Sequence, residues 1–451
     1  MRPLLLCAAM AGLLPALDRD DSSLAAQPVA IGAGARALGM GGAFTAIADD
    51  STATSWNPAG LTQCERPEAA LSGSWASTRA EAESGRTWAE TASELDHASV
   101  MFPFFAAGCM QTVGVAWMRQ YDYARAVSRR TGTVIVAPGN PSDVTTDTQA
   151  VERERSGSLA TLGVSWAVEP APGWSLGVTV NRWDDRFTGA SSYQESIHST
   201  SSFQWSADPF LDSEESWSGT TRVEARSGTS FVLGALWLPS PAWSLGVTVK
   251  PAATVKFHRA SRHVLILEYT GQGIPPDTTV VTRDAASELR LPPSATLGAA
   301  WRPDDDTAVS FDATWTRWSG FRVEDAAGTA SPVSVLVDPE DFDDLWTFRL
   351  GCERAVPLDG AVIVPRCGVL AEWTPAITPA ASSADLSGVA AGSDLWLGAS
   401  VGAGLFLRRT TWDAAVQVRH AEDAGTGQFT GLDQTADLTV VTARLGVSIQ
   451  F

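Results

Sequence analysis

The chain has 451 residues, of which 44% are hydrophobic, and it carries a formal net charge of −19. This acidic balance excludes a nucleic-acid-binding protein, because no basic stripe is present to neutralise phosphates. After residue 17 no apolar run approaches the roughly 20 residues that a transmembrane helix needs, so a membrane protein with this sequence would have to cross with strands.

The first residues have the pattern of an export signal. Arg2 supplies a positive start, and the stretch from Leu4 to Leu14 supplies a short apolar core. Cleavage after Ala16 or after Ala26 would suit the pattern equally. We therefore assign residues 1–26 to a signal peptide whose cleavage site is open.

The segment 27–66 is rich in Gly and Ala, and no single secondary-structure period fits it. Such a stretch suits a compact plug whose backbone bends tightly and packs closely inside something else. Asp and Asn side chains cap turns, and Pro fixes the direction in which the chain leaves. The residues that set this segment apart are Gly39, Gly41, Gly42, Asp49, Asp50, Asn57 and Pro58.

Residues 67–451 alternate between apolar and polar side chains in short runs. The run from Val441 to Phe451 places apolar residues on one face over a full membrane-spanning length. The heptapeptide Trp174–Val180 recurs identically as Trp243–Val249, and each copy follows a strand-like run and a turn that contains Pro. These repeats indicate hairpins, the unit of an up-and-down barrel.

Counting such runs predicts fourteen strands, an even number as single-chain bacterial barrels require. The connections alternate between short turns and long polar loops, the longest being the Ser-rich stretch around 188–226. The sequence therefore predicts an all-β, transmembrane antiparallel barrel. The strands are expected near 68–78, 97–106, 111–121, 157–168, 174–186, 227–238, 242–256, 287–302, 307–318, 344–355, 361–373, 393–407, 410–420 and 436–451.

The chain has 18 Trp and only 4 Tyr. An indole ring prefers the membrane interface, where its body is in an apolar environment and its N–H is hydrated. We expect one girdle near the short turns (Trp166, Trp174, Trp237, Trp243, Trp301) and another toward the long loops (Trp183, Trp315, Trp318, Trp346, Trp373). The alternative is that these rings fill the core of a soluble β-protein.

The plug segment resembles the N-terminal region of the FadL-type outer-membrane transport proteins, especially the PorV-like branch. The resemblance rests on the run GARALGMGGAF at 34–44, the step Ala48-Asp49-Asp50 and the stop Asn57-Pro58-Ala59-Gly60. It implies a fourteen-stranded barrel in the bacterial outer membrane, with a hatch that blocks the periplasmic end. It also implies diffusive uptake of hydrophobic small molecules such as long-chain fatty acids. The alternative is a PorV-like component of protein secretion and surface attachment that binds polypeptide cargo.

In the FadL-type family the ligand leaves sideways through a wall opening beside the hatch, made by a kinked strand. Pro251 and Pro365 are candidates for such a kink. A fatty-acid carboxylate would favour a cation in the lumen, for which the candidates are Arg349, Arg366 and Lys250. Because buried carboxylates need partners, we expect Asp49 and Asp50 to pair with inward-facing arginines of the wall, namely Arg349, Arg366 and Arg444.

Four cysteines remain after signal cleavage, and an oxidising periplasm permits disulfides. Cys64 lies between the plug and the first strand, and Cys109 lies in the first short turn. Cys352 and Cys367 sit at similar distances from the turn at 357–360. The strand positions favour the pairs Cys64–Cys109 and Cys352–Cys367.

No motif points to an enzyme. The G-x-G-x-x-A match at 32–37 lacks the βαβ context of a dinucleotide site, and the five His show no metal-ligand spacing. We therefore expect no cofactor and no metal. The acidic loop 338–344 is expected to be a solvated surface loop; the alternative is that its carboxylates bind divalent cations that bridge to lipopolysaccharide. Expected partners are outer-membrane lipid and lipopolysaccharide, the hydrophobic ligand, and the barrel assembly machinery through Phe451. Secretion-system proteins are expected on the alternative function.

Overall fold

The computed structural model describes residues 29–30, 32–82, 87–122, 125–137, 140–206, 212–269, 275–326, 328–334, 337–378, 389–424 and 435–451. The predicted signal peptide, residues 1–26, lies outside these ranges. Within them, no helix is long and apolar enough to cross a membrane.

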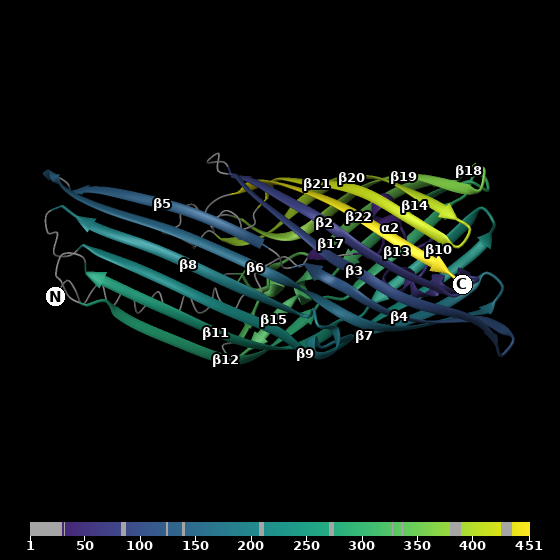
Figure 1. Cartoon of the computed structure of the whole chain (residues 1–451), viewed down its shortest axis with the longest axis horizontal. Coiled ribbons are helices and arrows are strands. Elements are labelled where there is room, and N and C mark those ends of the chain that lie inside the picture. The colour runs from purple at the N-terminus through teal and green to yellow at the C-terminus, as the bar shows by residue number, and fades with distance from the viewer. Residues whose placement is uncertain are drawn as a thin grey trace.

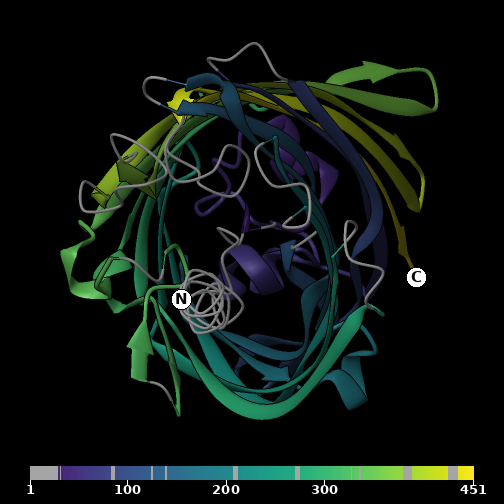
Figure 2. The same cartoon turned by 90° about the vertical axis from the view of Figure 1, so that its left-hand side faces the viewer.

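Fourteen antiparallel strands of the described chain form a closed ring, and the ring closes where the last strand pairs with the first, with Glu68 opposite Gln450 (Figures 1 and 2). The predicted fourteen-stranded barrel is therefore confirmed. In ring order the strands are β2 (Glu68–Ala82), β3 (Thr87–Ala106), β4 (Cys109–Asp122), β6 (Asn140–Ala171), β7 (Trp174–Trp183), β9 (Ser213–Ser240), β10 (Trp243–Lys250), β13 (Ser294–Trp301), β14 (Thr307–Thr316), β17 (Leu345–Arg354), β19 (Ala361–Thr378), β20 (Ala390–Leu407), β21 (Thr410–Ala424) and β22 (Ala436–Gln450).

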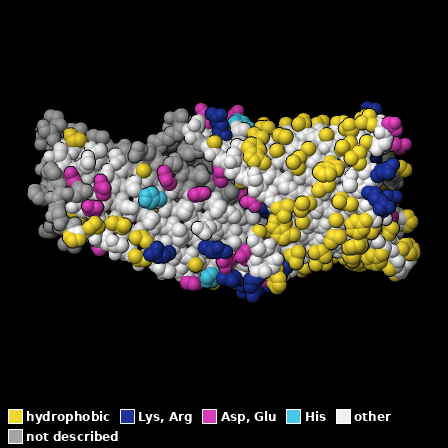
Figure 3. Space-filling model, in the orientation of Figure 1, with side chains coloured by type: hydrophobic (Ala, Val, Ile, Leu, Met, Phe, Trp, Pro, Cys, Tyr) yellow, Lys and Arg dark blue, Asp and Glu magenta, His cyan; other side chains and the backbone are white. Residues whose placement is uncertain are grey.

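The outer face of the ring carries a band of exposed apolar side chains around one half of the molecule (Figure 3). Along β7, Trp174, Leu176 and Val180 are exposed, whereas Ser175 and Thr179 between them are buried. This period of two places lipid outside and a polar surface inside. A soluble protein would not expose such a band, so the alternative of a soluble β-core is wrong.

Short turns gather at one end of the barrel, which the class places in the periplasm. The β3–β4 turn has only Ala107 and Gly108, with φ values of 55° and 81°. Trp174 and Trp237 stack beside this end with ring centroids 5.0 Å apart, as expected for a girdle. Trp183, predicted for the opposite girdle, is instead buried inside the barrel, because it ends β7 on the inward face.

Several strands continue far beyond the apolar band on the external side (Figure 1). The stretch 188–226, predicted to be a long polar loop, is β8 (Ser192–Trp205) and the first half of β9, so that prediction is wrong. The extension also contains β5 (Arg125–Ala137), β11 (Ala253–Tyr269) and β12 (Asp277–Leu291), with the short α4 (Asp185–Thr188), β15 (Arg322–Asp325) and β16 (Gly328–Ala330). The outward faces of β8, β11, β12 and the first half of β9 are largely polar, which removes the apolar outer face that marks a membrane strand.

Two predicted strands are broken by prolines. The run 242–256 divides into β10 and β11 at Pro251, and the run 287–302 divides into β12 and β13 at Pro292 and Pro293. Proline cannot donate to the ladder, so pairing stops there. β10 and β13 belong to the ring, whereas β11 and β12 form a hairpin above it.

The plug lies inside the lumen (Figure 2), toward the end of the barrel where the short turns gather (Figure 1). It consists of α2 (Ala35–Gly39), α3 (Ala53–Trp56) and the 3₁₀ helix η1 (Pro58–Gln63), joined by tight turns. Its own core is small and fully buried, with Met40, Phe44, Ile47 and Leu61 at its centre. Upstream of it, β1 (Val29–Ala30) pairs with the external end of β4.

Three cross-strand pairs of wall glycines receive the plug backbone. In each pair the two glycines are register partners on neighbouring strands: Gly177 with Gly234, Gly246 with Gly298, and Gly351 with Gly368. A methyl group on Gly246 would lie 2.5 Å from the carbonyl oxygen of Thr45, and one on Gly298 would lie 2.8 Å from Thr45 Cβ. The other pairs face Asn57-Pro58 and Met40-Gly41 in the same way. These pairs therefore form three sockets, and any side chain there would displace the plug.

A second apolar cluster fills the lumen on the external side of the plug. Its members come from seven strands and one loop, and they lie at the level where the prolines break the wall. It contains Leu159, Trp183, Tyr193, Val223, Ala225, Val255, Phe257, Leu289, Leu291, Phe321 and Val323. We call this set the lumen cluster.

We expect Gly368→Ala to destabilise the protein by about 1–3 kcal/mol, because the new methyl group would lie less than 3.0 Å from the backbone of Met40 and Gly41. The measurement is the midpoint of thermal unfolding, followed by the gel mobility of folded and heated barrel. Gly392→Ala is the matched control, since its nearest atom would lie 3.8 Å away. Equal midpoints for the two variants would contradict the socket.

Candidate functional site

Hydroxyl groups of the wall donate hydrogen bonds to carbonyl oxygens of the plug. The donors lie on the inward faces of four strands, β4, β7, β10 and β20, so the plug is held from several sides. The pairs are Ser400 to Gly39 (3.0 Å), Ser244 to Ala46 (2.9 Å), Thr179 to Thr54 (2.9 Å), Thr248 to Trp56 (3.0 Å) and Thr112 to Leu61 (2.9 Å). The polar face of the alternating strands therefore satisfies backbone groups that the plug's irregular structure leaves unpaired.

Asp312 and Asn57 complete this backbone pairing. Asp312 Oδ2 accepts from the amides of Phe44 and Thr45 at 3.0 and 2.9 Å. Asn57 Nδ2 donates to the carbonyls of Thr45 (2.9 Å) and Ala235 (3.1 Å), and its Oδ1 accepts from the amide of Ala59. Asn57 thus joins two parts of the plug to β9, and Pro58 follows it into the Gly177–Gly234 socket.

The three plug glycines lie against β17, β19 and β20. Gly41 and Gly42 have φ values of 66° and 81°, which side-chain-bearing residues rarely adopt. Gly39 comes within ordinary contact of Gly402, and a methyl group on Gly42 would lie 2.9 Å from Arg349 Cδ. Gly41 and Gly42 therefore allow a close approach of the plug to the wall, whereas Gly39 makes only an ordinary contact.

Arg36 of the plug is the partner of the paired aspartates. It contacts Asp49, lies 3.5 Å from Asp50, and forms an ion pair of 2.6 Å with Glu353 of β17. Glu353 also binds Arg366 at 3.0 Å, so the network continues into the wall. Burial alone would lower the pKa of Arg36, but Asp49 and Glu353 hold it well above its usual value. Burial raises the pKa of Asp50 to about 6.

The expected pairing of Asp49 and Asp50 with wall arginines is wrong. Arg349, Arg366 and Arg444 point inward as predicted, but each has other partners. Arg366 binds Glu353 and Asp413, Arg444 binds Asp96, and Arg349 donates to Thr314 Oγ1 at 3.0 Å. An arginine within the plug motif reaches the aspartates first, because it is only thirteen positions away.

The periplasmic side of the plug is charged. A polar cavity of about 380 Å³ opens there, and its lining includes Arg36, Asp49, Asp50, Asp305 and Glu353. An apolar solute that crossed the plug would have to enter this charged space, which is unfavourable. The plug is therefore a floor to the apolar part of the lumen.

Asp96 forms the centre of a buried ion cluster in the wall. It is the extra residue of a bulge in β3, opposite the step from Ser72 to Gly73. Its two oxygens bind Arg119 Nη2 of β4 at 2.6 Å and Arg444 Nε of β22 at 2.8 Å. Arg444 in turn donates to the carbonyls of Gly32 and Gly34, where the chain enters the plug.

The strands β3 and β4 part at this cluster. Their ladder ends at the pair His97–Met118, and toward the external side the described residues of β3 pair only with β2. The external end of β4 pairs with β6 on one side and with β1 on the other, so residues 29–30 lie along its free edge. We call this place the seam. The expected kink sites differ: Pro251 breaks a strand on another side of the ring, and Pro365 lies in the continuous β19–β20 ladder.

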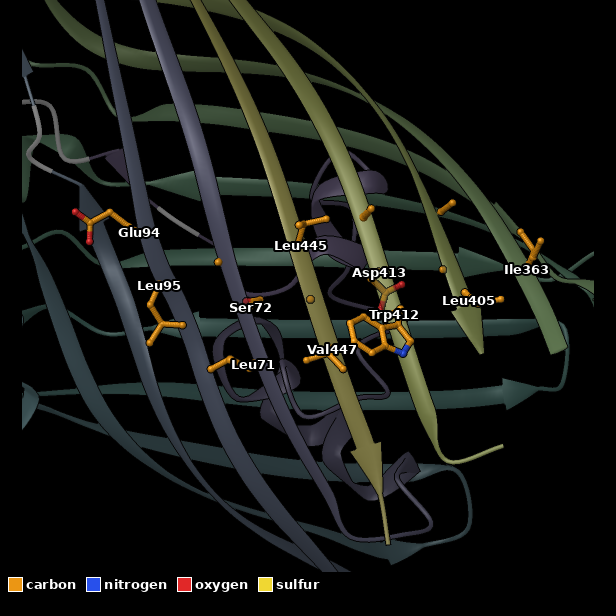
Figure 4. Close-up of a pocket in the computed structure, with 15 residues that line it drawn as sticks. Leu71, Ser72, Glu94, Leu95, Ile363, Leu405, Trp412, Asp413, Leu445 and Val447 are labelled. Atoms are coloured by element: carbon orange, nitrogen blue, oxygen red, sulfur yellow. The ribbon is translucent and has the colours of Figure 1, made fainter. Parts of the chain in front are cut away.

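A membrane-facing groove of about 700 Å³ leads away from the seam (Figure 4). It crosses β19, β20, β21, β22 and β2 on the outer face and ends at Glu94 and Leu95 of β3, beside the Asp96 bulge. Its exposed lining is apolar, including Leu71, Trp412 and Leu445.

The three cationic side chains that were predicted to bind a ligand carboxylate differ in whether they are free to do so. The side chain of Arg366 is 1% exposed and holds two carboxylates, so it cannot serve a ligand. Lys250 continues the inward face of β10 above Thr248, and no carboxylate partner is found for it among the described residues. Arg349 lies beside Gly42 at the floor of the lumen.

The four cysteines that the structure describes are free thiols. Cys64 Sγ donates to the carbonyl of Asp49, and Cys109 Sγ to the carbonyl of Ala106, so neither reaches the other as predicted. Burial raises the pKa of Cys64 well above its usual value. Cys352 and Cys367 are direct register partners of β17 and β19, the position that the predicted bridge needs, although the bridge is not formed.

Sequence reasoning missed Arg36, Glu353, Asp312 and the Asp96–Arg119 pair. Arg36 stands inside the glycine-rich motif, and its position was the available signal for a plug cation. Asp96 directly precedes the expected strand 97–106, and a bulge cannot be seen from alternation. The described residues contain no group of three or more metal-ligating side chains.

A closed fourteen-stranded ring with an exposed apolar band and a plugged lumen defines an outer-membrane barrel of the hatch-bearing class. Residues 22–357 match the family model described as "Outer membrane protein transport protein (OMPP1/FadL/TodX)". The chain belongs to this family, is a transport protein of the bacterial outer membrane and is not an enzyme.

Solved structures share this fold at low sequence identity. A Pseudomonas aeruginosa FadL homologue is 15% identical with a TM-score of 0.59, over 94% of this chain and 100% of its own. The P. putida toluene transporter TodX is 12% identical (TM-score 0.52; 93% and 99% covered), and the Ralstonia pickettii toluene transporter TbuX is 14% identical (0.51; 93% and 98%). No curated protein sequence matches the chain.

We expect Asp96→Ala to cost about 3–5 kcal/mol, because it leaves Arg119 and Arg444 buried without their carboxylate. Hydrogen exchange at residues 29–34 should speed up, since Arg444 would lose its anchor beside Gly32 and Gly34. Asp284→Ala, which removes a 73% exposed carboxylate, should change neither quantity measurably. Unchanged exchange at 29–34 in the Asp96 variant would show that the cluster does not hold the N-terminal segment.

Proposed function

We propose that this chain is a passive channel through which hydrophobic small molecules cross the outer membrane. The observation that carries the proposal is the contrast between the two sides of the plug. On the external side the lumen cluster offers buried apolar side chains, whereas the periplasmic side is a charged cavity. A hydrophobic solute thus gains free energy by entering from outside and loses it by continuing straight on.

The proposed exit is sideways, through the seam. Tyr121 lies on β4 at the seam and packs against the lumen cluster, stacking on Trp183 at 6.0 Å. Leu95 lies on the membrane side of the same place and ends the outer groove. A path from the lumen to the bilayer at the seam therefore requires that the strand β1 leave the edge of β4, and it passes beside the Asp96–Arg119–Arg444 cluster, whose charges are paired with one another.

The chemical class of the cargo can be argued from the apolar and cationic side chains that line the lumen. Neutral aromatic compounds, the cargo named for the toluene transporters that this fold resembles, would need the lumen cluster alone. Long-chain fatty acids would also need a cation for the carboxylate, and Lys250 with Arg349 would supply it. We favour amphipathic acids, because Lys250 faces the lumen without a described carboxylate partner.

The division of the chain into a signal peptide (1–26), a plug (27–66) and a barrel (67–451) is part of the proposal. Outer-membrane lipid and lipopolysaccharide would surround the barrel. The barrel assembly machinery would bind the terminal Phe451, which is 54% exposed on the membrane side and lies 6.1 Å from the ring of Phe102.

The alternative, a PorV-like role in protein secretion and surface attachment, rests on the wording of the motif at 34–44. A polypeptide cargo would need a wider path than the seam between β3 and β4. Co-purification of a stoichiometric protein partner with an empty lumen would favour this alternative.

We expect Leu95→Arg to reduce uptake of oleate and of toluene by about tenfold or more, because it would add an unpaired guanidinium on the apolar, membrane side of the proposed exit. Uptake would be measured in cells that lack other hydrophobic channels. Leu397→Arg is the control, since Leu397 is 57% exposed to lipid on a distant strand. If both variants fold and both keep wild-type uptake, the lateral path is wrong.

We expect Lys250→Met to reduce oleate uptake several-fold and to leave toluene uptake unchanged, because only the acid has a charge to bind. The methionine keeps the length of the side chain, so the shape of the lumen changes little. Equal loss for both compounds would mean that Lys250 shapes the lumen and does not bind the carboxylate.

A further inference from the structure

Lys and Arg side chains, interspersed with Asp and Glu, lie on the outer surface just beyond the apolar band (Figure 3), and those of β9, β11 and β12 are largely exposed. On β7 the step is abrupt: Val180 belongs to the exposed apolar band, and Arg182 follows two residues later on the same face. This is the depth at which lipid phosphates lie. The residues concerned are Arg182, Arg186, Arg222, Arg226, Lys256, Arg290 and Arg322, which we call the cationic row.

The members of the row are neighbours in space although they come from different strands. Across β9 and β11, Glu224 is the register partner of His258, and across β11 and β12, Lys256 is the partner of Glu288. Arg290 of β12 lies opposite Arg322 of β15. The row is therefore one continuous surface rather than scattered charges.

Each of three carboxylates in the row holds two arginines. Glu224 binds Arg222 at 2.6 Å and Arg226 at 2.7 Å. Glu324 binds Arg290 at 3.0 Å and Arg322 at 3.5 Å. Each cluster has one more positive than negative charge.

The third carboxylate, Asp184, binds Arg186 at 2.8 Å and Arg182 at 3.5 Å. Its side chain is fully buried, whereas the two arginines are 66% and 44% exposed. The carboxylate orients the two exposed guanidinium groups toward a second acceptor, and Arg182 also donates from Nη1 to the carbonyl of Gly228 at 3.5 Å. Lys256 with Glu288 and His258 with Asp284 add balanced pairs.

We propose that the cationic row binds the phosphate groups of lipopolysaccharide in the outer leaflet. The chain as a whole is strongly acidic, with a net charge of −19, so it repels an anionic surface except where cations are concentrated. Guanidinium groups bind phosphate with two parallel hydrogen bonds, and their orientation by a shared carboxylate reduces the entropy lost on binding. The external position selects the outer-leaflet glycolipid over the phospholipid of the inner leaflet.

The test compares variants that each remove two positive charges. In R222Q/R226Q and in R290Q/R322Q one cluster loses both arginines, and R408Q/R409Q removes two exposed arginines from a periplasmic turn as the control. Each barrel would be purified from a lipopolysaccharide-containing outer membrane in mild detergent. Native mass spectrometry then counts the lipopolysaccharide molecules that remain bound.

We expect each row variant to retain several-fold less lipopolysaccharide than wild type, and the combined four-site variant about tenfold less or lower. The control should match wild type. Wild-type retention in both row variants, or equal loss in the control, would overturn the proposal. If the four-site variant does not fold, the two double variants decide.

Competition separates lipopolysaccharide from other phosphates. Stripped wild-type barrel would be offered vesicles containing lipopolysaccharide or phosphatidylglycerol, with and without inorganic phosphate. We expect preferential uptake of lipopolysaccharide that millimolar inorganic phosphate does not reverse. Equal uptake of phosphatidylglycerol, or displacement by inorganic phosphate, would overturn the assignment. The outcome does not depend on the cargo of the channel.

Discussion

The structure depends on the contact between the plug backbone and the barrel wall. An irregular segment inside a barrel has backbone N–H and C=O groups that no sheet or long helix satisfies, and each unpaired group is costly once buried. The inward face of the alternating strands supplies what is missing: hydroxyls for carbonyls, and Asp312 for the amides of Phe44 and Thr45. The glycine pairs let the backbone approach closely enough for these bonds to form. The floor of the lumen is a consequence of this fit.

The buried charges add specificity to the fit. Arg36 and Arg366 meet at Glu353, so one network spans the plug, β17, β19 and β21. A buried ion network adds little net stability compared with apolar packing, but breaking it is costly, so it selects one seating of the plug against others. The glycine sockets fix the distance between plug and wall, and the charges fix which part of the plug lies at each socket.

The sequence predicted the barrel well because membrane strands carry a physical signature. Lipid outside and a polar lumen inside force a period of two, as Trp174–Val180 and its repeat at 243–249 show. The repeat also contains Gly177 and Gly246, whose role as sockets cannot be seen without the partner strands. Beyond the membrane the alternation disappears, so the sequence predicts a loop where the structure has β8 and the first half of β9. Pairing across the lumen, such as Arg36 with Glu353 over 317 positions, has no local signal at all.

The seam reflects the same physical requirement as the glycine sockets, namely that buried backbone N–H and C=O groups must find partners. A barrel wall that stops pairing exposes backbone edges, and in a membrane such edges must be covered. Here the bulge at Asp96 ends the β3–β4 ladder, and β1 covers the free edge of β4. The charged side chains at this point, Asp96, Arg119 and Arg444, pair with one another within the wall. The short covering strand is held by its pairing with β4 and by Arg444, which binds Gly32 and Gly34, while the plug behind it is held at three sockets. Opening the wall therefore requires the displacement of a few N-terminal residues, and the floor of the lumen can stay in place.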